Sequence, residues 1–223
     1  MPPFLFLRLR LMKIETIAKV KNSIKITLDN GEKLFLRYEV FLKNGIRKED
    51  ELSEEEIARL IRQNQFFYVK ESAFRFLGLR IHSEKELQRK LSAKKYDKEI
   101  IASVIKELKE NNYLDDELFA REFSEEKTNK KAFGQNKVKA ELKQRGISQE
   151  IIDKVLEVKS AQTELDNAQM LAEKKLSSLN SRNVDKKKIV QRLYSFLLSK
   201  GFDFDVIKAV VNKVLEPTDE EIE

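Results

Sequence analysis

Residues 138–155, which read VKAELKQRGISQEIIDKV, decide the fold because the same pattern occurs three times along the chain. Apolar side chains in this stretch stand four or five residues apart, as in two amphipathic helices joined by a short turn. The spacing recurs in residues 87–104, LQRKLSAKKYDKEIIASV, and in residues 193–210, LYSFLLSKGFDFDVIKAV. Repetition at a period of about 50 residues predicts a helical array in which each copy buries its apolar face against itself and its neighbours. The matching positions are Leu87, Leu91, Tyr96, Ile100 and Val104, then Val138, Leu142, Ile147, Ile151 and Val155, then Leu193, Leu197, Phe202, Val206 and Val210.

The turns between the paired helices also match. Gly146 and Gly201 stand where the residue after a helix adopts a left-handed conformation, which glycine adopts without strain. Lys95 occupies this position in the first copy, so it must adopt the conformation at some cost or turn differently. A further amphipathic segment precedes each pair, which makes each copy a three-helix unit. These preceding segments lie around Ala73, Ala120 and Ala168.

Residues 13–42 have a different pattern, in which apolar and polar residues alternate. Alternation with a period of two predicts strands, and Asn30-Gly31 is a strong hairpin signal between two of them. We therefore predict a small N-terminal β hairpin or meander. The acidic run 49–56 is interpreted as a solvated linker and the start of a helix, with a capping box at Ser53.

The sequence therefore predicts a mainly α protein, in which three tandem three-helix repeats follow the N-terminal β segment. Met12 stands directly before the alternating segment, so we expect translation to begin there rather than at Met1. Pro217 and the acids after it predict a tail outside the repeats. The expected divisions are 1–50 for the β segment (with 1–11 as a non-native start), 51–112 for a linker helix and repeat one, 113–159 for repeat two, 160–216 for repeat three and 217–223 for the acidic tail.

Composition excludes several classes of protein. The 223 residues include no cysteine, one histidine and six glycines, and 37% are charged. A chain without cysteine has no disulfide, no cysteine nucleophile and no thiolate metal site, and we find no Gly-rich phosphate loop. Because no nucleophile–base pair and no metal-ligand spacing is apparent, we expect neither an enzyme nor a cofactor. Arg8 and Arg10 interrupt the apolar start and no later segment is apolar enough to cross a membrane, so we expect a soluble cytoplasmic protein.

The net charge is +6, and the positive excess gathers in copies two and three. Corresponding helices of stacked repeats face similar directions, so these cations would form one basic strip suited to DNA phosphates or to an acidic groove of a protein. The alternative is an ordinary solvated face, because lysine is common on helices and Lys137 and Lys139 point about 200° apart at 3.6 residues per turn. Phe133, within the basic loop, is the aromatic residue to test for contact. The candidate partner-binding residues are Lys130, Lys131, Lys137, Lys139, Lys143, Arg145, Lys186, Lys187, Lys188 and Arg192.

Other polar and aromatic residues have structural interpretations. His82 precedes a helix and has no evident catalytic or metal partner, so we interpret it as a capping or packing residue. Asp115 and Asp116 are interpreted as a helix cap and a first-turn acid rather than a cation site. Tyr96 shares its repeat position with Ile147 and Phe202, which indicates a core residue rather than a base-stacking one.

Several segments of the chain resemble the RecX family of regulatory proteins. They are residues 74–87 (FRFLGLRIHSEKEL) with Lys90, Leu91 and Tyr96, then 113–120 (YLDDELFA), 134–137 (GQNK), 142–147 (LKQRGI) and 198–202 (LSKGF). The resemblance covers roughly residues 65–215 and implies that the tandem repeats form a curved array. It also implies a non-enzymatic protein that binds the RecA recombinase filament on single-stranded DNA and suppresses its ATPase and strand exchange, and that touches DNA as well. The β segment lies outside this resemblance.

Two alternatives stay open beside this function. A helical protein that binds single-stranded or duplex nucleic acid directly would use the same cations, although no helix has an Arg, Asn and Gln cluster suited to base edges. A helical scaffold with another partner is the third possibility. In each case we expect a monomer. Charge reversal at Lys137, Lys139 and Lys143 is expected to weaken partner binding with the fold intact, whereas Leu142→Asp is expected to unfold copy two.

Overall fold

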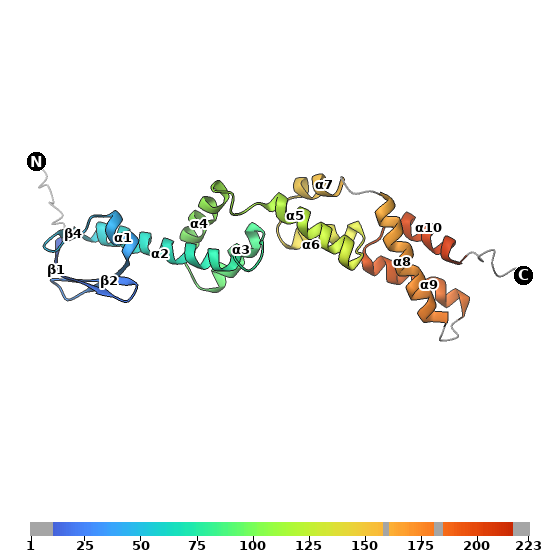
Figure 1. The fold of residues 1–223 in the computed structure, drawn as a ribbon, viewed down its shortest axis with the longest axis horizontal. Coiled ribbons are helices and arrows are strands. Elements are labelled where there is room, and N and C mark those ends of the chain that lie inside the picture. The colour runs from blue at the N-terminus through green and yellow to red at the C-terminus, as the bar shows by residue number, and fades with distance from the viewer. Residues whose placement is uncertain (1–10, 158–160, 181–184, 216–223) are drawn as a thin grey trace, which may run out of the picture. The chain divides into compact units, whose positions relative to one another are not determined.

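The computed structural model describes residues 11–157, 161–180 and 185–215 (Figure 1). Two predicted features, the segment before Met12 and the acidic tail 217–223, therefore lie largely outside the described residues. The chain divides into two compact units. The first unit comprises residues 1–80 and 87–113, and the second comprises residues 81–86 and 114–223. Each unit is described separately below.

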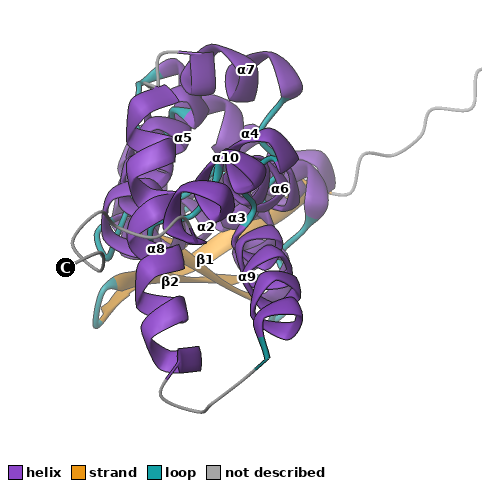
Figure 2. Ribbon diagram, turned by 90° about the vertical axis from the view of Figure 1, so that its right-hand side faces the viewer, coloured by secondary structure: helices purple, strands orange, loops and turns teal. Residues whose placement is uncertain are grey.

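The first unit begins with a four-stranded antiparallel sheet in the order β3-β2-β1-β4. Figure 2 shows its strands in orange, with β1 and β2 labelled. Alternate residues of β2 are buried, and Ile24 and Ile26 lie opposite Leu36 and Leu34 of β3. The predicted meander is thus confirmed, with the turn at Gly31 between β2 and β3. The strands are β1 (Leu11–Val20), β2 (Ser23–Leu28), β3 (Lys33–Arg37) and β4 (Glu51–Ser53).

Two parts of the β segment differ from the prediction. The alternating pattern was expected to continue as a strand beyond residue 37, but the chain forms a short helix, α1 (Tyr38–Lys43). Val40 and Phe41 are adjacent apolar residues that both pack on the core of the sheet, and helical backbone turns both toward it. Part of the acidic run interpreted as a linker is the strand β4, which pairs with β1 and adds Leu52 to the hydrophobic core.

Helix α2 (Glu54–Leu77) connects the sheet with the first repeat. Its start has the predicted capping box, since Ser53 Oγ accepts from the Glu56 amide and the Glu56 carboxylate accepts from the Ser53 amide. The first half of α2 packs Ile57 and Leu60 into the core of the sheet. Asn64 on the same helix accepts a hydrogen bond of 2.8 Å from the Arg37 amide, and so covers the free edge of β3.

The predicted three-helix repeats are present. The second half of α2 forms copy one with α3 and α4, while α5, α6 and α7 form copy two and α8, α9 and α10 form copy three. The first two apolar positions of each copy are fully buried, from Leu87 and Leu91 to Leu193 and Leu197. The elements are α3 (Glu84–Ala93), α4 (Lys98–Glu110), α5 (Asp116–Glu125), the π-helix η1 (Glu126–Lys130), α6 (Gln135–Gln144), α7 (Gln149–Glu157), α8 (Ala161–Asn180), α9 (Lys186–Lys200) and α10 (Phe204–Leu215).

The turn residues of the three copies share one backbone conformation. Lys95 has φ 62°, close to the 86° of Gly146 and the 89° of Gly201. Lysine therefore adopts the left-handed conformation in the first copy, which costs about 1–2 kcal/mol that glycine avoids. The repeat pattern outweighs the local preference of this residue.

Candidate interaction surface

The second unit joins copies two and three through the ends of their middle helices. Helix α6 begins at Gly134 without a side-chain cap, and its first amides bond to copy three instead. The Gly134 amide donates to the Lys200 carbonyl at 3.0 Å, and the Asn136 amide donates to the Gly201 carbonyl at 3.1 Å. The carbonyl end of α9 thus satisfies the amide end of α6, with the two helix dipoles in a favourable order. We call this contact the α9–α6 junction.

Backbone approaches backbone so closely at this junction that two glycines are required. A Cβ on Gly134 would lie 2.4 Å from the Gly201 carbonyl, and a Cβ on Gly201 would lie 2.3 Å from Cβ of Lys137. The Gln135 amide adds a hydrogen bond of 3.0 Å to the carboxylate of Glu164 on α8. Copies two and three are therefore fixed to one another by backbone geometry as well as by side chains.

A second junction joins the end of α6 to the start of α3. Residues 81–86, which include the start of α3, belong to this unit. Ser83 Oγ accepts from the Glu86 amide and donates to the Arg145 carbonyl at 2.7 Å. Arg145 Nε lies 3.3 Å from Glu86 Oε1, and its guanidinium lies 4.4 Å from the ring centre of Phe123. In both junctions the end of one helix contacts the start of another. We call this one the α6–α3 junction.

Three of the ten predicted partner-binding residues are engaged in contacts within this unit. Lys137 Nζ donates to the Ser199 carbonyl at 3.2 Å and lies 4.4 Å from the ring centre of Phe133. Lys139 Nζ lies 3.1 Å from Asp153 Oδ1, and Arg145 belongs to the α6–α3 junction. These three side chains are therefore already held by contacts within the unit.

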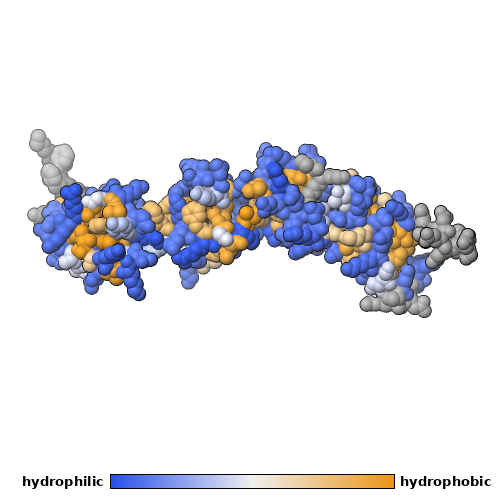
Figure 3. All heavy atoms as spheres, viewed as in Figure 1, coloured by the Kyte–Doolittle hydropathy of each residue, from blue (hydrophilic) through white to orange (hydrophobic). Residues whose placement is uncertain are grey.

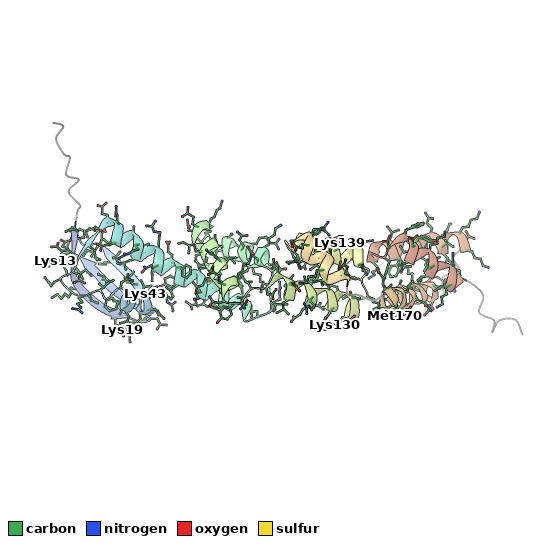
Figure 4. All side chains as sticks on the ribbon, turned by 90° about the horizontal axis from the view of Figure 1, so that it is seen from above. Lys13, Lys19, Lys43, Lys130, Lys139 and Met170 are labelled. Atoms are coloured by element: carbon green, nitrogen blue, oxygen red, sulfur yellow. The ribbon has the colours of Figure 1, made fainter. Side chains whose placement is uncertain are left out.

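The other seven predicted residues are exposed and make no ion pair with the described part of the chain. In the view of Figure 4, Lys130 and Lys139 lie at opposite edges of the second unit, so the predicted cations do not all share one face. The structure therefore separates a set of free cations from a set of structural ones. The free set is Lys130, Lys131, Lys143, Lys186, Lys187, Lys188 and Arg192, and its role in partner binding stays a prediction.

Lys127 is a further cation in this region, and it is largely buried. Burial lowers its pKa below the ordinary value, and its neighbour Lys131 lowers the pKa further. The Nζ atom lies 4.8 Å from the ring centre of Phe123 and 3.9 Å from the Glu141 carboxylate. Lys127 therefore contributes to the core of copy two rather than to its surface.

The structural interpretations of Asp115 and His82 fit the structure. Asp115 Oδ1 accepts from the amides of Glu117 and Leu118, as expected of a helix cap. His82 is 2% exposed, beside the α6–α3 junction. Phe133, the aromatic residue selected for testing, is half-buried between Lys137 and Lys200.

A cavity of about 440 Å³ lies between α5, η1, α7 and α8. Glu117 is paired there with Lys154 at 2.7 Å and with Arg121 at 3.2 Å, and the hydrogen bond from Lys154 lowers its pKa. The wall also includes Phe133 and Glu164. Among the described residues, no group of His, Cys, Asp or Glu is arranged to hold a metal ion. In the same part of the chain, no helix is long and apolar enough to span a membrane.

Comparison with known proteins assigns all three copies to one family. Sequence models described as the first, second and third three-helix domains of RecX match residues 70–108, 115–156 and 162–211. The regulatory protein RecX of Clostridium botulinum (strain Alaska E43 / Type E3) is 33% identical over 206 residues, which cover 92% of this chain and 96% of that one. The chain belongs to the RecX family. The regulatory protein RecX of Clostridium perfringens (strain 13 / Type A) is 32% identical over 92% of this chain and 96% of that one.

Solved RecX structures share the fold. A crystal structure of regulatory protein RecX matches 91% of this chain and all of that one, with a TM-score of 0.75 and 24% identity. The structure of RecX from Lactobacillus salivarius matches 68% of this chain and 97% of that one, with a TM-score of 0.62 and 21% identity. The resemblance stated from the sequence is confirmed, and the RecX domain matches begin and end close to the three helical copies.

The α9–α6 and α6–α3 junctions were missed by the sequence analysis. Gly134 could have indicated the α9–α6 junction. A glycine at the cap position has no side-chain oxygen, unlike Ser, Thr, Asp or Asn, so the first amides of the helix need another hydrogen-bond partner. Helices α6 and α9 also have no acid in their first turn, unlike the other described helices. For α6 the reason is the α9–α6 junction, because carbonyl oxygens occupy the place that an acid would otherwise take.

Proposed function

We propose that this chain is a regulator that binds the RecA recombinase filament and inhibits its ATPase and strand-exchange activities. Through that inhibition it modulates homologous recombination and DNA repair during the SOS response, in the cytoplasm and without catalysis of its own. The observation that carries the proposal is the tandem match of all three helical copies to RecX domains, in a chain similar over 92% of its length to proteins named as regulatory.

The free cations support a binding role. Lys130, Lys131 and Lys143 in copy two and four further residues in copy three are exposed and unpaired within the described part of the chain. Fixing the copies together through the α9–α6 junction allows cations of both copies to act on one extended partner. Many modest contacts then add without the entropy cost of ordering each copy separately.

The test measures the DNA-dependent ATPase and the strand-exchange activity of RecA with increasing amounts of the purified full chain. We expect both activities to fall, and more strongly when the chain is added to filaments already formed on single-stranded DNA. If both activities are unchanged at a large molar excess of a correctly folded chain, the proposal is wrong. Sedimentation of the free chain tests the accompanying expectation of a monomer.

Direct binding of nucleic acid is the second candidate, and the same free cations favour it. Such binding is expected to be weak and independent of sequence. It should decrease with salt by a log–log slope of about −0.7 per phosphate contact on single strands and about −0.9 on duplex. Tight binding to DNA in the absence of RecA, at physiological salt, would favour this candidate over the first.

A further inference from the structure

Copy three has a row of apolar side chains on its surface. Val190, Tyr194 and Leu198 stand four residues apart on α9, so they lie on one face of the helix. Phe204, the first residue of α10, extends the row, because its ring centre lies 5.9 Å from that of Tyr194. Val190 is 37% exposed, Leu198 58% and Phe204 59%, while Tyr194 is half-buried. We call these four residues the α9 row.

The other two copies have no such row. When Leu193 is aligned with the matching buried residues Leu87 and Val138, the positions equivalent to the α9 row are polar in copy one and in copy two. Copies one and two bury the same core positions with these polar residues in place, so packing of a three-helix unit does not require the apolar ones. An exposed apolar patch that the fold does not need is typical of an interaction site. The equivalent residues are Glu84, Gln88, Ser92 and Lys98 in copy one, and Gln135, Lys139, Lys143 and Gln149 in copy two.

Positive charge lies at the first end of the row. Lys186 and Lys187 lie one turn before Val190 on the same face of α9, whereas Arg192, two residues after Val190, points about 200° away from it. The first turn of α9 has three lysines and no acid, although the helix dipole favours acids there by about 0.3–1 kcal/mol each. These lysines are therefore not explained by the stability of the helix. Asp203 and Asp205 flank Phe204 at the other end of the row.

We propose that the α9 row is the docking site of an acidic amphipathic helix of a protein partner. The distance from Val190 to Leu198 is about 12 Å along the helix axis at 1.5 Å per residue, which matches two turns of such a helix. Its apolar side chains would pack on the row, and its acids would lie against Lys186 and Lys187. This inference deepens the proposed function, since it names the kind of segment that the filament would present.

A second copy of this chain suits the row less well. A stable dimer buries about 1,200–2,000 Å² in total, and four side chains that are each less than 60% exposed supply only a small part of that area. An apolar anchor surrounded by charge is instead suited to one part of a larger contact, to which the other free cations add. Figure 3 shows apolar surface over α8 and α10 among otherwise hydrophilic residues of copy three.

The test uses the full chain and two labelled synthetic helices of about 14 residues. Both helices have the same leucine face, and their other face has glutamates in one and lysines in the other. Fluorescence anisotropy measures the binding of each. We expect the chain to bind the glutamate helix at least tenfold more tightly than the lysine helix, because Lys186 and Lys187 lie beside the row.

Two variants locate that binding. Leu198→Lys with Phe204→Gln gives copy three the polar character of the other copies, and it should reduce binding of the glutamate helix at least tenfold. The matched control is Met170→Lys with Leu118→Gln, which changes two exposed apolar residues on α8 and α5 (Met170 is labelled in Figure 4) and should leave binding unchanged. Lys186→Glu with Lys187→Glu changes only exposed cations, so it is expected to fold and to reverse the preference between the two helices.

The proposal is overturned by equal binding of the two synthetic helices, or by unchanged binding in the Leu198→Lys, Phe204→Gln variant. A concentration-dependent dimer that this variant abolishes would also overturn it, in favour of a second copy. The assay contains no RecA. A chain that binds the glutamate helix but leaves RecA activity unchanged would therefore contradict the proposed function and not this inference.

Discussion

The amide of Asn136 donates a hydrogen bond of 3.1 Å to the carbonyl of Gly201, so the start of α6 in copy two is completed by the end of α9 in copy three. The bond requires a backbone approach that only glycine allows. A Cβ on Gly201 would overlap Lys137, and the φ of +89° is itself unfavourable for any other residue. The two copies are consequently expected to unfold as one cooperative unit.

Gly201→Ala is expected to destabilise this unit by about 3 kcal/mol, from left-handed strain of about 1–2 kcal/mol and overpacking of a similar size. Gly134 has an ordinary φ, so Gly134→Ala should reduce the free energy of unfolding only through overpacking, by about 1–3 kcal/mol. Urea unfolding followed by circular dichroism measures both. Gly31→Ala is the control, because its φ is +82° but nothing lies within 4 Å, so it should lose about 1–2 kcal/mol. Equal effects at Gly31 and Gly201 would contradict the close approach.

Leu142 is fully buried in copy two, and its truncation tests the core of that repeat. Leu142→Ala is expected to cost about 2–5 kcal/mol through lost burial and a cavity. Leu142→Asp should unfold the copy, because it buries an unpaired charge. Leu118→Ala, at a site 45% exposed, is the control and should change stability by less than about 0.5 kcal/mol. Denaturant midpoints give the comparison, and a mild effect of Leu142→Asp would argue against a shared core.

Much of the fold was predictable from the sequence because the apolar spacing of one copy is repeated in the other two. Even Lys95, where glycine is absent, adopts the left-handed turn of Gly146. The strand β4 was not predictable, since Leu52 is a single apolar residue within an acidic run. Helix α1 was missed because Leu34 and Leu36 set an alternating pattern that continues by coincidence into it.

The candidate site was only partly predictable. Charge identifies a cation, but only the folded chain shows whether that cation has a partner within the protein. Lys139 and Lys143 are equivalent in the sequence, yet Lys139 is paired with Asp153, fourteen residues further along, and Lys143 is not. Arg145 is bound to Glu86 across the α6–α3 junction, which no local pattern reveals.

Titration of Asp153 reports on the structural role of Lys139. Hydrogen bonds from Gln149 and then from Lys139 lower the pKa of Asp153 below its ordinary value. Lys139→Met should raise this pKa toward the ordinary value, and carboxyl chemical shifts followed by NMR across pH 2–6 measure it. Lys143→Met is the control and should have the smaller effect, since Lys143 acts only through its charge at a distance.

The sign of the pH dependence follows from that shift. A carboxylate whose pKa is lowered by folding stabilises the folded state above its unfolded pKa of about 3.9, and this contribution is lost as pH falls through the folded value. The urea midpoint of the wild-type chain should therefore decrease more steeply between about pH 4 and pH 2 than that of Lys139→Met. Parallel curves would show that the ion pair contributes nothing measurable.

The separation of free from structural cations makes the sharpest prediction for binding. Lys130→Glu with Lys143→Glu reverses two exposed, unpaired charges in copy two, so it should weaken binding to the RecA filament at least fivefold with stability unchanged. Lys174→Glu with Lys208→Glu is the matched control, with the same change of net charge at two exposed lysines outside the predicted set. Cosedimentation with filaments on single-stranded DNA measures the affinity. Equal weakening in the two variants would indicate an effect of overall charge, and no local site.

Arg145→Ala is expected to behave in the opposite way. It removes the pair with Glu86, which is 7% exposed, and so takes one cation away from that buried carboxylate. Loss of one partner of a largely buried pair costs about 3–5 kcal/mol, so the denaturant midpoint should fall clearly. Arg145→Lys keeps the charge but not the planar guanidinium over Phe123, and should recover only part of the loss. A side chain that holds the α6–α3 junction cannot be removed without loosening that junction. If Arg145→Ala leaves stability intact and weakens filament binding as much as Lys130→Glu with Lys143→Glu does, Arg145 therefore belongs with the free cations.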